Sequence, residues 1–169
     1  FSLPLMVRHV AGQARGVGAR FLVDAYCGVG LFALALAPHF EKVCGVEISP
    51  AAVALARENA ALNRRGNCLF VEGRAEAIFA HIPFAGAEAA VIIDPPRAGA
   101  TPEFLGQLIA FGPKRVVYVA CDPATQARDA KILVEGGYRI AAVQPFDLFP
   151  QTRHIENVIT FDRADAGKE

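Results

Sequence analysis

The fold of this chain is decided near its carboxyl end by the stretch Tyr138-Arg-Ile-Ala-Ala-Val-Gln-Pro-Phe-Asp-Leu-Phe-Pro-Gln-Thr-Arg-His-Ile-Glu-Asn-Val-Ile-Thr-Phe161. Its two apolar runs, Tyr138–Gln144 and Ile155–Phe161, have the composition of β-strands. Only residues 145–153, which include Pro145 and Pro150, separate these runs. A right-handed crossover between parallel strands needs a dozen or more residues, usually with a helix. The last strand is therefore predicted to run antiparallel to its neighbours.

Upstream of this stretch, short apolar runs alternate with Ala- and Leu-rich stretches of helical length. This alternation predicts a parallel sheet with helices on both faces. The predicted strands are Phe21–Tyr26, Lys42–Ile48, Cys68–Glu72, Ala89–Asp94, Arg115–Ala120, Tyr138–Gln144 and Ile155–Phe161. The predicted helices are Pro4–Gln13, Leu31–Ala37, Pro50–Asn63, Arg74–Ala80, Pro102–Ala110 and Pro123–Glu135. Three of these helices begin with a proline that follows a polar residue, which is a favourable helix start.

The composition indicates one domain, residues 1–169, since 53% of the side chains are hydrophobic and can form a core. The 17 basic and 17 acidic residues cancel, so any surface for nucleic acid has to be local. No apolar stretch approaches the length of a membrane span. The four cysteines show neither metal-ligand spacing nor a secreted framework, so we expect no metal site and a cytoplasmic protein. Because the chain begins at Phe1, we expect a fragment without a secretory signal.

A glycine loop, Asp24-Ala-Tyr26-Cys-Gly28-Val-Gly30-Leu-Phe-Ala33, follows the first predicted strand. Gly28 and Gly30 allow the backbone to turn tightly and to approach a ligand at the carboxyl edge of the sheet. Glu47 ends the next strand, where a carboxylate can accept hydrogen bonds from a ribose diol. The same residues also fit an ordinary strand–helix turn beside a solvated glutamate, and the glycine spacing also fits a dinucleotide fingerprint.

The reversed last strand helps to decide whether the cofactor is NAD or S-adenosyl-L-methionine. A Rossmann-like, mostly parallel seven-stranded sheet with an antiparallel last strand is the architecture of class I methyltransferases and is atypical of plain NAD domains. The chain also has no second domain that would hold a hydride acceptor. These features favour S-adenosyl-L-methionine over NAD as the cofactor.

A second loop, Asp94-Pro-Pro-Arg97, ends the fourth predicted strand. The prolines restrict the backbone and hold Asp94 at the edge of the sheet, above the expected pocket. Methyltransferases that act on exocyclic amines commonly carry an aromatic residue after the two prolines. Arg97 stands there in this chain, so amine N-methylation is disfavoured. The alternative is that Asp94 only caps a turn.

A thiol follows the fifth predicted strand, and a carboxylate lies at the start of the last one. Cys121 follows the fifth strand and precedes a helix, and a thiol near a helix N-terminus gains thiolate character. Glu156 lies at the start of the last strand and is a candidate base, with His154 close by to orient it or to cap the turn. Alternatively, Cys121 is a small buried side chain and Glu156 an exposed charge. Cys27 competes with Cys121 as the nucleophile, but it lies in the glycine loop and is therefore expected beside the methyl donor rather than the acceptor.

Together these residues resemble the RNA (uracil-5-)-methyltransferases, a family that makes 5-methyluridine in tRNA or rRNA. The matching stretches are Asp24–Phe32, Gly45–Asn63, Ile92–Gly99, Val117–Asp129 and Phe146–Glu156, in the order of the family. The resemblance implies that Tyr26, the glycine loop and Glu47 bind S-adenosyl-L-methionine and that Asp94 lies between the cofactor and the uracil. It implies further that Cys121 is the nucleophile and Glu156 the base. The expected partner is an RNA substrate, tRNA or rRNA, and the expected state is a monomer without a membrane anchor.

Three departures from the family pattern accompany this resemblance. The chain has Ala120-Cys121-Asp122-Pro123 where the family usually has Ser-Cys-Asn-Pro, and Leu31 where the family often has Asn. A Phe-Phe-Gln segment and the N-terminal RNA-binding portion of the family are absent from this sequence. Two alternatives stay open: a methyltransferase of another substrate, such as cytosine C5 in RNA, and a cofactor-binding domain without catalysis. Cytosine enzymes typically carry a second cysteine in the Asp-Pro-Pro loop, and this chain has none there.

Overall fold

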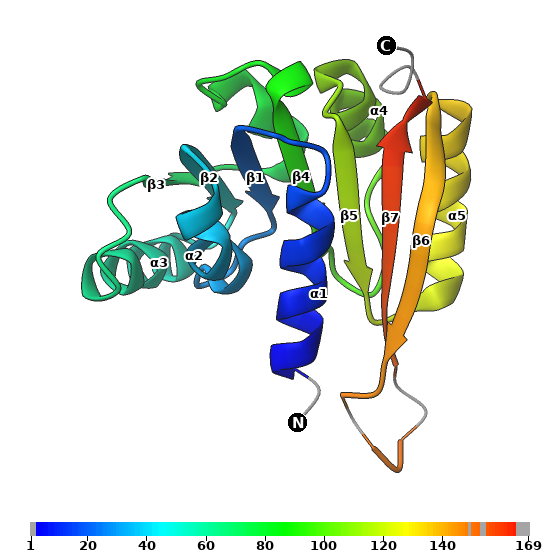
Figure 1. Cartoon of the computed structure of the whole chain (residues 1–169), viewed down its shortest axis with the longest axis horizontal. Coiled ribbons are helices and arrows are strands. Elements are labelled where there is room, and N and C mark those ends of the chain that lie inside the picture. Colours follow the sequence, from blue (N-terminus) through cyan, green and yellow to red (C-terminus); the bar gives the residue numbers. More distant parts are fainter. Residues whose placement is uncertain (1–2, 149, 153–154, 165–169) are drawn as a thin grey trace.

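A computed structural model describes residues 3–148, 150–152 and 155–164 of the chain. Seven strands form one sheet in the order β3-β2-β1-β4-β5-β7-β6. Figure 1 shows β3 at one side of the sheet and the hairpin of β6 and β7 at the other. The strands are β1 Phe21–Ala25, β2 Lys42–Glu47, β3 Cys68–Glu72, β4 Ala89–Ile93, β5 Arg115–Ala120, β6 Tyr138–Phe146 and β7 Glu156–Arg163.

The reversed last strand is confirmed. β7 pairs antiparallel with both β5 and β6, whereas the pairs among β1 to β5 are parallel. Figure 1 shows the arrow of β7 pointing opposite to those of β5 and β6. β6 continues past its predicted end to Phe146 and therefore includes Pro145. This proline is tolerated because β6 is an edge strand, where a missing N–H breaks no bond to a further neighbour.

The helices agree with the predicted ones to within two residues, with one exception. They are α1 Leu3–Arg15, α2 Leu31–Leu36, α3 Pro50–Leu62, α4 Pro102–Phe111 and α5 Pro123–Glu135, with short 3₁₀ helices η1 Ala37–His39, η2 Ala75–His81 and η3 Gly86–Glu88. The predicted α-helix Arg74–Ala80 is wrong in type, because this segment forms η2. Its Ile78 is buried and its Phe79 stacks on Phe104 and Phe111 of α4. Tertiary packing of this kind overrides helix propensity.

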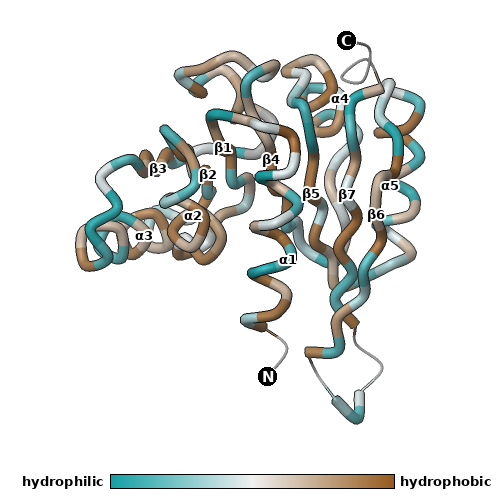
Figure 2. The backbone as a smooth tube through the Cα atoms, viewed as in Figure 1, coloured by the Kyte–Doolittle hydropathy of each residue, from teal (hydrophilic) through white to brown (hydrophobic). Residues whose placement is uncertain are grey.

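Two hydrophobic cores cover the two faces of the sheet, as predicted. Residues of α1, α2 and α3 pack on one face, and residues of α4 and α5 on the other. In Figure 2 hydrophilic and hydrophobic segments alternate along α1, as expected for a helix with one face on the sheet. The central strands β1 and β4 are buried throughout, which is typical of strands covered on both faces.

The carboxyl ends of β1, β2, β4 and β5 meet at one edge of the sheet. Helices α3, α4 and α5, which follow β2, β4 and β5, begin with side-chain caps: Ser49, Thr101 and Asp122 accept hydrogen bonds from first-turn N–H groups. Ligands of open α/β sheets bind at this edge. Among the helices described, none has the length and apolar character that crossing a bilayer requires.

Candidate active site

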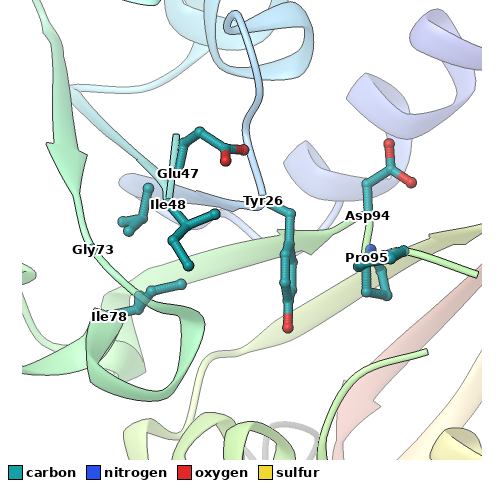
Figure 3. Close-up of a pocket in the computed structure, with 9 residues that line it drawn as sticks. Tyr26, Glu47, Ile48, Gly73, Ile78, Asp94 and Pro95 are labelled. Atoms are coloured by element: carbon teal, nitrogen blue, oxygen red, sulfur yellow. The ribbon is translucent and has the colours of Figure 1, made fainter. Parts of the chain in front are cut away.

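A cavity of about 440 Å³ opens at the carboxyl edge of the sheet. Figure 3 shows Tyr26 between Glu47 and Asp94, with Ile48, Gly73 and Ile78 on the side of Glu47 and Pro95 beside Asp94. The complete lining is Tyr26, Val46, Glu47, Ile48, Gly73, Ile78, Asp94, Pro95 and Pro96. Most of these side chains are apolar, and two carboxylates provide the charge. A cavity of this volume is typical of small-molecule sites.

The glycine loop makes the tight turn that its glycines predict, and the left-handed backbone extends to Tyr26. Tyr26, Gly28 and Gly30 have φ angles of 63°, 53° and 94°, so the chain reverses within a few residues. The N–H of Gly28 donates to Glu47 Oε2 at 3.1 Å, and the N–H of Ser49 donates to Oε1 at 2.9 Å. Each carboxylate oxygen of Glu47 is thus held by one backbone donor and keeps a free acceptor position toward the cavity.

A buried carboxylate lies under this loop. Asp24 is 1% exposed, and its Oδ2 accepts a hydrogen bond from the N–H of Ala33 at 2.8 Å. Its Oδ1 has no hydrogen-bond partner within the described part of the chain. Burial raises the pKa of Asp24 to about 7, and repulsion from Asp94 and Glu47 adds to the rise. An unpartnered buried oxygen is costly, and ligand sites are one place where such groups persist.

The Asp94 carboxylate is in contact with solvent through the cavity. The protein atoms packed around it nevertheless remove part of its hydration, which raises its pKa to about 7, and repulsion from Glu156 acts in the same direction. Desolvation also raises the pKa of Glu156, whereas the charge of Arg97 lowers it. Glu156 is therefore close enough to Asp94 and to Arg97 to interact electrostatically with each of them.

Helix α5 fixes the backbone of the loop that follows Asp94. Asp129 is fully buried, and its Oδ2 accepts hydrogen bonds from the N–H of Ala100 and from the hydroxyl of Tyr118, at 2.8 and 2.7 Å. Arg128 donates to the carbonyl oxygens of Ala98 and Ala100. Gly99 between them has φ 80°, and a Cβ at this position would lie 2.5 to 2.6 Å from the side chains of Arg128 and Asp129. Both the angle and the close approach require glycine.

The sheet register brings Cys121 and Glu156 together. β5 and β7 pair antiparallel up to Ala120 and Asn157, and the next residues of the two segments are Cys121 and Glu156. Alternation places Val119 and Val158 on the face that carries α1. Cys121 and Glu156, two positions along from them, fall on the same face. Opposite positions of an antiparallel pair lie about 5 Å apart.

Cys121 is free and half-buried. Two N–H groups at the start of α5 are already used, because Asp122 Oδ1 accepts hydrogen bonds from Ala124 and Thr125 at 2.9 and 3.2 Å. The thiol still lies next to the positive end of the helix dipole.

The other cysteines are poor nucleophiles. Burial raises the pKa of Cys27 strongly, and it raises the pKa values of Cys44 and Cys68 to about 11. Cys27 also lies on the cofactor loop rather than beside Glu156. These findings favour Cys121 among the four thiols, in agreement with the sequence interpretation.

The structure thus places the predicted residues in two adjoining groups. Tyr26, Glu47 and Asp94 line the cavity; Gly28 donates a hydrogen bond to Glu47, and Gly30 is the residue before the first residue of α2. Cys121 follows the end of β5 and Glu156 begins β7, and Glu156 is close enough to Asp94 of the cavity lining to raise its pKa. His154 lies outside the described residues. Across the described ranges no cluster of His, Cys, Asp or Glu could hold a metal ion.

Sequence reasoning missed part of the cavity. The apolar wall of Val46, Ile48 and Ile78 was not predicted, and neither was the buried carboxylate of Asp24. Ile48 directly follows Glu47, so its position at the end of β2 was a usable signal. Ile78 had none, since it belongs to the segment predicted as a regular helix.

Comparison with known proteins identifies the family. The family model described as "tRNA (Uracil-5-)-methyltransferase" matches residues 6–164. The chain belongs to this family. A relative from Schizosaccharomyces pombe named "tRNA (uracil(54)-C(5))-methyltransferase" is 45% identical over 148 residues, which is 85% of this chain and 28% of the relative. A Bacillus cereus relative, described as an uncharacterized RNA methyltransferase, is 46% identical over 88% of this chain and 32% of its own length. The chain thus spans about a third of the curated relatives that it matches.

Solved structures agree with this assignment to the tRNA (uracil-5-)-methyltransferase family. The tRNA (uracil-54, C5)-methyltransferase of Pyrococcus abyssi, determined in complex with S-adenosyl-L-homocysteine, superimposes with a TM-score of 0.79 at 34% identity. The match covers 93% of this chain and 37% of the archaeal one. An rRNA methylase from Streptococcus thermophilus has a TM-score of 0.72 at 12% identity, over 96% of both chains. This second likeness shows the shared fold alone.

Proposed function

We propose that this chain is the catalytic domain of an enzyme that transfers a methyl group from S-adenosyl-L-methionine to C5 of a uridine in tRNA or rRNA. The observation that supports the proposal most strongly is the register of β5 and β7: its last pair is Ala120 and Asn157, and Cys121 and Glu156 are the next residues of the two segments, near the cavity that Asp94 lines. The named activity of the yeast and archaeal relatives supports the same reaction.

The residues around the cavity fit the cofactor. Glu47 offers two oriented carboxylate oxygens for a ribose diol, and the apolar side chains of Ile48 and Ile78 offer a surface for a purine ring. When bound, S-adenosyl-L-methionine supplies an electrophilic methyl group.

The protein's own residues make C5 reactive. C5 of uracil is a weak nucleophile because its electrons are delocalised over the ring. Addition of the Cys121 thiolate to C6 forms a carbon–sulfur bond and leaves an enolate whose C5 carries negative charge. A protonated Asp94, which a pKa of about 7 allows near neutral pH, can donate a hydrogen bond to the carbonyl oxygen on C4, which shares this charge.

Glu156 completes the reaction. Once C5 bears the methyl group, Glu156 removes the remaining C5 proton and the bond between Cys121 and C6 breaks, so the thiolate and the aromatic ring are restored. Its raised pKa makes Glu156 a stronger base than an exposed glutamate. A base stacked within an RNA helix cannot present C5 and C6 to these groups, so the target uridine has to be single-stranded or flipped out.

The test is covalent trapping in the natural full-length protein. RNA with 5-fluorouridine at the target position, incubated with S-adenosyl-L-methionine, should leave a stable adduct on Cys121, because fluorine cannot be removed as a proton. Peptide mapping identifies the attached residue. An adduct on Cys27, or methyl transfer to uridine without any adduct, would contradict the mechanism. Cofactor binding without transfer would favour a binding domain, and transfer to cytosine would favour the other substrate class.

A further inference from the structure

A buried pair of amide side chains lies beside the Cys121–Glu156 pair. Gln126 of α5 is fully buried, and its Nε2 donates to the carbonyl oxygens of Tyr118 and Asn157 at 3.0 and 3.1 Å. Its Oε1 accepts from Asn157 Nδ2 at 2.7 Å. Both amide hydrogens and the amide oxygen of Gln126 are therefore used. One side chain thus connects α5, β5 and β7 at the end of the β5–β7 ladder.

This pair is not required to hold the two strands together. β5 and β7 already pair over six rungs, from Arg115 and Asp162 to Ala120 and Asn157. An apolar side chain of similar size would fill the space under α5 without the cost of desolvating an amide. Buried polar networks add geometric definition, because each bond fixes both distance and direction.

The amide pair lies where it can define the orientation of Glu156. Asn157 is the neighbour of Glu156 in β7, and successive side chains of a strand point to opposite faces. The bond from Asn157 to Gln126 fixes Asn157 on the α5 face, which directs Glu156 to the opposite face, where Cys121 lies. Gln126 also follows Cys121 closely in sequence, at the first turn of the helix that Cys121 precedes. The amide of Gln126 thus links the segment that carries Cys121 to the segment that carries Glu156.

We infer that Gln126 and Asn157 are positioning residues, which hold the carboxylate of Glu156 at the distance and angle from Cys121 that proton removal from C5 requires. This inference rests on the proposed function. It concerns the last step, since cofactor binding depends on the other end of the site, around Glu47. A displacement of about 1 Å in a catalytic group can reduce a rate by about 100-fold.

The main test compares three variants of the full-length protein acting on uridine RNA. Asn157→Ala removes only the bond to Gln126 Oε1, whereas Gln126→Leu removes all three bonds. We expect a kcat reduced about 10- to 100-fold with the KM for RNA and the Kd for S-adenosyl-L-homocysteine within about twofold. Both variants should accumulate the methylated protein–RNA adduct. Gln144→Leu is the control, since it makes the same change at an exposed glutamine of β6.

A swapped variant, Gln126→Asn with Asn157→Gln, adds a rescue test, because it keeps both amides and the summed side-chain volume. Turnover above that of Gln126→Leu supports positioning through the amide pair. Thermal melting of each variant separates folding from function. If Gln126→Leu does not fold, the result for Asn157→Ala decides between the two outcomes. This variant should perturb folding less, because Asn157 is only half-buried and its truncation removes one hydrogen bond. Normal turnover, or an equal loss of adduct formation and of adduct resolution, would overturn the inference. A wild-type protein that forms no adduct would refute the proposed function instead.

Discussion

The carboxylate of Asp24 should make this domain less stable than the fold allows, and Asp24→Asn should recover the difference. The substitution keeps the shape of the side chain. The amide oxygen can still accept the hydrogen bond from the N–H of Ala33, which Asp24 Oδ2 accepts at 2.8 Å. The charge disappears from a position that is 1% exposed and where one oxygen has no partner in the described structure.

The size of the effect follows from the pKa of Asp24. Burial raises this pKa from 3.8 to about 7, and each pH unit corresponds to about 1.36 kcal/mol. The charged form thus costs the folded state about 4 kcal/mol above pH 7. Burying the neutral amide has a cost of its own, so we expect a net gain for Asp24→Asn of about 1–3 kcal/mol at pH 8.

The sign of the pH dependence is also fixed. Because the folded pKa is raised, folding takes up a proton between about pH 4 and pH 7, and the stability of the wild type falls as the pH rises through this window. The variant lacks this contribution. Near pH 4, where Asp24 is almost uncharged, only the cost of burying the amide remains, so the variant should be less stable than the wild type by about 1–3 kcal/mol, and its relative stability should rise by about 4 kcal/mol between pH 4 and pH 8.

Urea unfolding at several pH values measures this difference. Asp147→Asn is the matched control, since it removes an exposed carboxylate and should change the stability by less than about 0.5 kcal/mol. An Asp24→Asn protein that is less stable than the wild type at pH 8, or a difference that does not vary between pH 4 and pH 7, would refute the reasoning. Asp24 would then be stabilised as an anion in the folded state.

Variants at Glu47 and Gly99 probe the cavity and the loop that follows Asp94. Glu47→Ala should weaken S-adenosyl-L-homocysteine binding by about 1–3 kcal/mol in a calorimetric titration, because hydrogen bonds to a charged group are lost; unchanged affinity would remove Glu47 from the site. Gly99→Ala should destabilise the domain by about 2–4 kcal/mol, since a left-handed φ and contacts under 3 Å with Arg128 and Asp129 combine. In contrast, Gly106→Ala on α4, where a Cβ meets nothing within 4 Å, should stabilise by about 0.5–1 kcal/mol; similar effects of both glycine variants would contradict the role of the close approach at Gly99.

Most of the fold was predictable because its signals are local. The antiparallel last strand followed from the short connection between two apolar runs, and the structure confirms it. The starts of α3, α4 and α5 followed from a capping residue and a proline. The segment Ala75–His81 was not predictable in this way, since its 3₁₀ geometry depends on packing against α4, which is distant in sequence.

The site was predictable where a strand end displays a polar side chain. Tyr26, Glu47 and Asp94 were found in this way, and they do line one cavity. The roles of Cys121 and Glu156 stay predictions, which the register of β5 and β7 supports. The sequence could not show the buried amide pair of Gln126 and Asn157, because a glutamine within a helix has the same pattern whether it faces solvent or the sheet.

The division of labour between Cys121 and Glu156 is the central claim, and one denaturing gel tests it. Full-length wild-type, Cys121→Ala and Glu156→Gln proteins are incubated with uridine RNA and S-adenosyl-L-methionine labelled in its methyl group. Cys121→Ala should form no covalent complex, because the step that activates C5 is lost. Glu156→Gln should add to C6 and accept the methyl group, and should then persist as a labelled protein–RNA adduct, since the amide cannot take the C5 proton. Normal turnover by Glu156→Gln would remove this residue from the mechanism, and methyl transfer by Cys121→Ala would contradict covalent catalysis altogether.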